Sequence, residues 1–150
     1  MNYISKNYTK EHAYSGIHVY HYHHDTALYI HARIATQGSL GIKNCHGFVD
    51  HETRLCFAHN GILNIGERAD MTDSEIFFRD IFLPVYKYGG WREVEPIIRE
   101  VINWGKFVFM DGNGKLRYFG NYIKGSDNVL YSNGTYQHYK CNYLYHNNLL

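Results

Sequence analysis

The order of its segments constrains the fold of this chain most, because strand-like stretches at both ends enclose two amphipathic stretches in the middle. Residues 16–22 and 27–35 are rich in aromatic and β-branched side chains, which predicts a hairpin. A further strand is expected over residues 53–59. Strands followed by helices and then by strands favour sheet and helix layers packed face to face over an alternating parallel fold.

Two helices are expected in the middle of the chain. Thr72 and Glu75 have the spacing of a capping box, in which both side chains satisfy backbone donors at a helix start. The apolar residues that follow continue to Pro84, which should end or kink the helix. A second helix is expected over residues 91–103, interrupted or started afresh near Pro96. Its buried face would consist of Val94, Ile97, Ile98, Val101 and Ile102.

Strands return in the last third of the chain. Residues 106–110 and 115–119 flank an Asp-Gly-Asn-Gly stretch, which is a strong hairpin signal. Residues 129–132 and 136–144 predict one or two further strands. There is no internal repeat and no linker-like stretch, so residues 1–150 are expected to form a single domain.

The composition argues against several classes of function. Apolar residues make up 45% of the chain and charged residues 19%, which is typical of a globular protein. A net charge of +1 argues against nucleic-acid binding, so the many aromatic side chains are expected to pack sheets. No long apolar run or signal-like start occurs, which predicts a cytoplasmic protein with no membrane partner. Its three cysteines, Cys45, Cys56 and Cys141, are then expected to be reduced thiols.

Four segments together carry a resemblance to one family. They are residues 31–38 (HARIATQG), 44–48 (NCHGF), 58–62 (AHNGI) and 72–75 (TDSE). In order and spacing they resemble the glutaminase domain of class II glutamine amidotransferases, which are N-terminal-nucleophile hydrolases. Residues 106–136 also resemble the small stand-alone members of this family, many of them from phage genomes. The resemblance implies an α+β fold, an αββα sandwich with two antiparallel sheets between helical layers, trimmed in this short chain.

The resemblance also implies a pocket for glutamine or a related amino acid. The Arg33 guanidinium would clamp the α-carboxylate through two parallel hydrogen bonds, unless it forms a surface ion pair. Asp73 would pair with the α-ammonium, although a first-turn carboxylate can also simply favour the helix dipole. Thr36 is expected to shape the same site.

An oxyanion hole is expected at Asn60 and Gly61. The Asn60 side-chain amide and the Gly61 backbone N–H would both point at the oxygen that becomes charged in a tetrahedral intermediate. The alternative is that this Asn-Gly pair is a plain hairpin turn. His31, His46 and His59 match family positions that are interpreted as scaffold.

The catalytic nucleophile of the family is missing from the pattern. Family members attack the amide with the thiol of a cysteine whose free α-amino group acts as the base. Asn2 stands at the matching position and offers no thiol. Gln37 and Gly47 also depart from the family's usual histidine and proline. The expected protein is therefore a pseudoenzyme without a cofactor, which acts by binding an amino-acid-like ligand or a protein partner, such as a host enzyme in a phage setting.

Two alternatives remain open. The first is an active glutaminase or amidohydrolase with an unorthodox nucleophile, for example after cleavage ahead of Ser15. The second is a zinc site, although the histidine-rich hairpin spreads its side chains over both faces of a strand. The residues considered for zinc are His18, His21, His23, His24 and Asp25, and separately Cys45, His46, Cys56 and His59.

Overall fold

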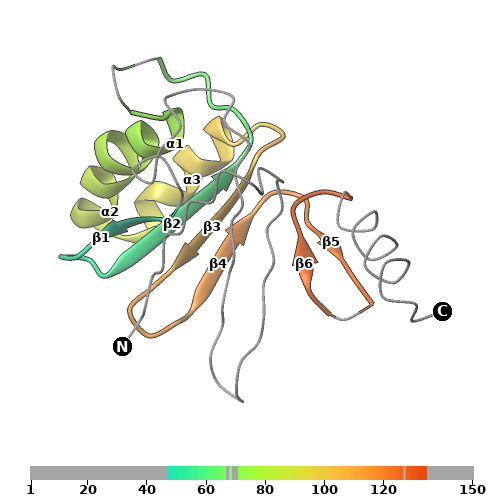
Figure 1. Cartoon of the computed structure of the whole chain (residues 1–150). Coiled ribbons are helices and arrows are strands. Elements are labelled where there is room, and N and C mark those ends of the chain that lie inside the picture. Colours follow the sequence, from blue (N-terminus) through green and yellow to red (C-terminus); the bar gives the residue numbers. More distant parts are fainter. Residues whose placement is uncertain (1–46, 67, 69–70, 127, 135–150) are drawn as a thin grey trace, which may run out of the picture.

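A computed structural model of the chain describes residues 47–66, 68, 71–126 and 128–134, and they form a mixed α+β fold with two antiparallel sheets (Figure 1). The larger sheet has four strands in the order β1-β2-β3-β4. These strands are β1 (Phe48–Asp50), β2 (Leu55–Asn60), β3 (Lys106–Met110) and β4 (Leu116–Phe119). The smaller sheet pairs β5 (Ile123–Lys124) with β6 (Leu130–Tyr131). The strands expected at residues 16–22, 27–35 and 136–144 lie outside the described residues.

Pro84 was expected to end or kink the first helix; the helical stretch continues through this proline, so Pro84 does not end the helix. The stretch consists of α1 (Asp73–Ile76), the π-helical segment η2 (Phe77–Phe82) and α2 (Leu83–Gly89). The N–H of Leu83 donates to the carbonyl of Phe78, five residues earlier. A π-helical turn changes the hydrogen-bond register immediately before the proline, which has no N–H of its own to donate. Gly90, with φ at +67°, then ends α2.

The second helix, α3 (Trp91–Val101), begins where the sequence predicts. Pro96 lies inside this helix and does not interrupt it, contrary to expectation. The proline is exposed, so water can solvate the carbonyl that loses its helical donor. Of the expected buried face, Val94, Ile98 and Ile102 are buried against the sheet. The other two members, Ile97 and Val101, are only half-buried.

The hairpin between β3 and β4 is confirmed. Gly114, with φ at +81°, donates its N–H to the Asp111 carbonyl, and the Asp111 carboxylate accepts from the N–H groups of Asn113 and Lys115. An aspartate that bonds the backbone ahead of it is typical of tight turns. The two strands pair in register from Phe107 with Phe119 onward.

Phenylalanine side chains form the core between the helices and one face of the larger sheet. Phe57 on β2 is fully buried, and its ring centroid lies 4.7 Å from that of Phe109 and 5.4 Å from that of Phe78. Figure 1 shows the helices gathered on this side of the four-stranded sheet. Each such ring pair contributes about 0.5–1.5 kcal/mol beyond the burial of apolar area. Among the described residues, the phenylalanines are therefore used for packing, as expected of aromatic side chains.

The opposite face of β2 is also buried. Successive strand residues point to opposite faces, so Cys56 and Ala58 face away from the helices. Their exposed fractions are 5% and 0%, and Val108 on the neighbouring strand is 8% exposed. Cys56 is thus a buried thiol, as the sequence predicts. A strand buried on both faces is typical of a central layer in a multilayered fold.

None of the helices among the described residues has the length and apolar character needed to cross a membrane.

Candidate functional site

The end of β2 and the start of α1 meet at one place, and three of the expected site residues lie there. Asn60 ends β2, Gly61 follows it, and Asp73 is the first residue of α1. The backbone N–H of Leu63 donates to the Asp73 carboxylate over 2.7 Å between N and Oδ2. This hydrogen bond fastens the loop after Gly61 to the first turn of the helix. The residues after Gly61, from 62 to 66, form no strand, so Asn60 and Gly61 are not a plain hairpin turn.

Asp73 holds this junction with both carboxylate oxygens. Its Oδ1 accepts from the backbone N–H of Ser74 at 2.7 Å and lies 3.2 Å from the Ser74 hydroxyl oxygen. The side chain is half-buried, so one side of it stays open to solvent. A carboxylate has about four lone-pair sites, so these bonds leave capacity for a cation such as an ammonium group.

The Asn60 side chain is oriented by a residue far away in the sequence. Its amide nitrogen donates to the hydroxyl oxygen of Ser132, just after β6, at 2.9 Å. An asparagine amide nitrogen carries two hydrogens, so a second N–H remains for another acceptor. The smaller sheet thereby fixes the direction of a group that the sequence assigns to an oxyanion hole.

Gly61 occupies a position that only glycine fills without strain. Its φ is +147°, in a region that residues with a side chain rarely adopt. A Cβ added there would lie 2.7 Å from Nε2 of His59 and 2.9 Å from the Cα of Gly105. Gly105 precedes β3, and a Cβ on it would also meet the His59 ring at 2.9 Å. Two glycines therefore make room for one imidazole.

His59 lies beneath this turn and suits the scaffold role that the sequence suggests. It is 2% exposed, its Nδ1 lies 2.9 Å from the Ser74 hydroxyl oxygen, and its ring packs edge-on against Phe107. Burial disfavours the charged imidazole and lowers the pKa of His59 to about 4, although the negative charge of Asp73 acts in the opposite direction. The ring is therefore neutral at pH 7. Asp73, Ser74 and His59 form a continuous hydrogen-bonded series from the surface to the core.

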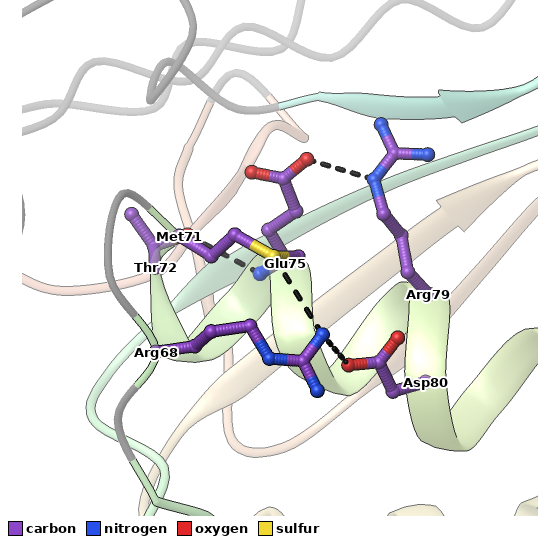
Figure 2. Close-up of polar contacts among 6 residues, drawn as sticks. All are labelled: Arg68, Met71, Thr72, Glu75, Arg79 and Asp80. Carbon is purple, nitrogen blue, oxygen red and sulfur yellow. Dashed lines mark hydrogen bonds and ion pairs between the residues drawn. The ribbon is translucent and has the colours of Figure 1, made fainter.

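The segment ahead of α1 is held by contacts that Figure 2 shows. The Thr72 hydroxyl oxygen accepts from the N–H of Glu75, which confirms half of the expected capping box. The Glu75 carboxylate accepts from Arg79 Nε at 2.7 Å. Arg68 reaches across the helix start to Asp80 at 2.8 Å. These contacts fix where α1 begins and hence where Asp73 lies.

The remaining expected site residues, Asn2, Arg33 and Thr36, lie outside the described residues. So do Ser15, and Cys45 and His46 of the zinc alternative. Cys56 and His59 are three residues apart on β2, so their side chains point to opposite faces and do not converge. In the described part of the chain, no group of three or more potential ligands could hold a metal ion.

Sequence reasoning missed three residues at this junction, namely Ser74, Gly105 and Ser132. Ser74 lies inside the capping segment, where a serine hydroxyl is easily taken for an exposed group on the helix surface. Gly105 directly precedes the strand at residues 106–110, and a glycine there is a signal for close backbone approach that the sequence offers. Ser132 lies 72 residues from Asn60. No local sequence pattern indicates the contact between Ser132 and Asn60.

No family model, curated protein or solved structure matches the chain.

Proposed function

We propose that this chain is a glutamine amidotransferase-like binding protein whose pocket holds glutamine or a related amino acid. The observation that carries the proposal is the junction of the Asn60-Gly61 turn and the Asp73 carboxylate. A free amino acid presents an ammonium, a carboxylate and a side-chain amide, and a site needs a partner for each. Asp73 and Asn60 are the proposed partners for two of these groups, and Arg33 is the proposed third.

The chemistry of the junction favours binding of an amide-bearing ligand. Asp73 brings negative charge that is half-exposed, where an ammonium can reach it. The Asn60 amide and the Gly61 N–H offer donors for an amide carbonyl oxygen.

The proposed architecture is an αββα sandwich. The larger sheet has helices on one face, and its other face is buried at Cys56, Ala58 and Val108. We place the strands expected at residues 16–22 and 27–35 in a second sheet against that face. The second strand would carry Arg33 toward the site.

The lack of a thiol at Asn2 favours binding without turnover. The test compares glutamine hydrolysis by the wild-type chain with that of an Asn2→Cys variant released from a cleavable fusion, so that the cysteine bears the free amine. A matched control keeps Met1 ahead of the same cysteine, because this leaves the thiol without an adjacent amine.

Hydrolysis gained only when the cysteine is the first residue, and lost again in the Asn2→Cys/Asn60→Ala double variant, supports the proposal. Robust hydrolysis by the wild-type chain would overturn it in favour of an amidohydrolase with a different nucleophile. Absence of both glutamine binding and gained hydrolysis would contradict the pocket itself.

A further inference from the structure

A hollow lies between α3 and β4, on the helix-covered side of the larger sheet. It has a volume of about 630 Å³ and is open to solvent. Glu95, Arg99 and Ile102 of α3 form one wall, and Arg117 and Phe119 of β4 form the other. We name this hollow the α3–β4 groove. Its volume falls in the usual range of small-molecule sites, roughly 300–1,000 Å³.

Arg117 is held in a defined orientation in this groove. Its guanidinium carbon lies 4.8 Å from the ring centroid of Trp91, so the cation rests on the indole face. Among the residues that the structure describes, no carboxylate forms an ion pair with Arg117. A guanidinium supported on one flat face still presents N–H groups along its edge, and these match the oxygens of a carboxylate or phosphate.

Arg99 adds a second cation to the groove. Its guanidinium carbon lies 5.9 Å from the Phe119 ring centroid, and its Nη2 lies 2.6 Å from Oε1 of Glu95. Among the described residues that line the groove, Glu95 is the one acidic residue, so with the two arginines they carry a net charge of +1. Glu95 holds Arg99 in place and also weakens its attraction for any other anion.

Apolar surface lies beside these cations. Ile102 and Phe119 line the groove, and Phe119 is partly buried against the aromatic core. Gly120 also lines the groove, and it approaches the backbone so closely that an added Cβ would lie 2.4 Å from the Gly105 carbonyl oxygen.

We propose that the α3–β4 groove binds a small molecule that carries a phosphate or carboxylate group beside an apolar portion. The anion accepts hydrogen bonds from Arg117 and Arg99, and the apolar portion rests on Phe119 and Ile102. The arginines that would bind the anion take no part in the Asn60–Asp73 junction, so this proposal stands or falls independently of the proposed function.

The test measures binding of AMP, inorganic phosphate and benzoate to the full chain by calorimetry at low ionic strength. AMP and benzoate distinguish a phosphate ester from a carboxylate as the preferred anion, and each carries a ring beside it. The wild-type protein is expected to bind at least one of them better than inorganic phosphate, with an affinity that falls as salt is added. Arg117→Gln is expected to weaken binding about tenfold or more, because it removes charge-assisted hydrogen bonds.

Three further variants sharpen the test. Arg99→Gln should also weaken binding. The Arg99 side chain is 68% exposed, so this variant is expected to fold even if Arg117→Gln does not. Glu95→Gln should strengthen binding severalfold, because it removes the competing carboxylate. Arg92→Gln is the matched control: Arg92 lies on the same helix, is 93% exposed and does not line the groove, so the affinity should stay unchanged. The proposal is overturned if the wild-type protein binds none of the three probes, or if Arg92→Gln weakens binding as much as Arg117→Gln and Arg99→Gln do.

Discussion

The carboxylate of Asp73 accepts the backbone N–H of Leu63 at 2.7 Å and so ties the loop after Gly61 to the first turn of α1. Leu63 itself is 4% exposed, so its backbone donor has little access to water. One side chain therefore determines both the path of the loop and the position of the half-exposed charge at the candidate site. Its structural and binding roles can be separated by experiment.

The structural role of Asp73 predicts a loss of stability on truncation. Asp73→Ala removes the acceptor for Leu63 and for the Ser74 N–H, and should lower the free energy of unfolding by about 2 kcal/mol. Urea denaturation measures this change. Asp80→Ala serves as the control, because Asp80 forms an exposed pair with Arg68 and its loss should cost less than about 1 kcal/mol. Equal costs for the two variants would contradict the role assigned to Asp73.

Gly61 predicts a large effect from a single added methyl group. Gly61→Ala places a Cβ within 3 Å of His59 and Gly105 at a φ of +147°, and should lower the free energy of unfolding by about 3 kcal/mol. Gly114→Ala is the control, because Gly114 also has a positive φ but nothing lies within 4 Å of the added Cβ. Gly114→Ala should lower the free energy of unfolding by about 1 kcal/mol. Denaturant unfolding that gives Gly61→Ala the smaller cost would contradict the crowding around His59.

The burial of His59 as a neutral ring predicts that the protein loses stability in mild acid. Its pKa falls from the ordinary value of 6.5 to about 4 in the folded protein, so the unfolded chain binds more protons between these two values. Stability due to this residue is complete above pH 6.5 and is lost as the pH falls toward 4, by roughly 3 kcal/mol in all. Unfolding of the wild-type protein and of His59→Gln should be compared at pH 7, 6, 5 and 4. The wild-type curve should have the steeper decline; parallel curves would mean that His59 is not buried as a neutral ring.

The elements that could be predicted from the sequence are those whose signals are local. The β3–β4 hairpin follows from its Asp-Gly-Asn-Gly turn, and the start of α3 and its buried face follow from apolar spacing. The strands β1 and β5 span only three and two residues, and so short a stretch has no measurable alternation. These two strands were not predicted.

The difference between the expected and the observed effect of the two prolines also has a physical cause. Pro84 and Pro96 were both expected to disturb helices, yet a π-helical turn accommodates the first and solvent exposure the second. Neither solution can be read from the residue type alone, because each depends on how the helix lies against the sheet.

The residues of the candidate site show the same difference between local signals and long-range contacts. Asn60, Gly61 and Asp73 were chosen from motif segments, and the Leu63–Asp73 hydrogen bond ties the loop after Gly61 to the helix that Asp73 begins. The contacts around these residues are long-range. Ser132 and Asn60 are 72 positions apart in the sequence, and His59 and Ser74 are 15 positions apart. Such partners emerge only once the sheets and helices are packed.

The most direct measurement for the central claim is the affinity of the wild-type chain and of Asp73→Asn for L-glutamine and for N-acetylglutamine, determined by calorimetry. Asp73→Asn removes the charge that would pair with the ammonium, which the acetylated ligand lacks. It also replaces one of the two oxygens that accept the Leu63 and Ser74 N–H groups, and this structural effect should act on both ligands alike. The wild-type chain should bind glutamine, and the substitution should weaken glutamine about tenfold or more beyond any loss for the acetylated ligand. Asp80→Asn should alter neither affinity. No glutamine binding by the wild-type chain, or an equal loss for both ligands in Asp73→Asn, would contradict the account.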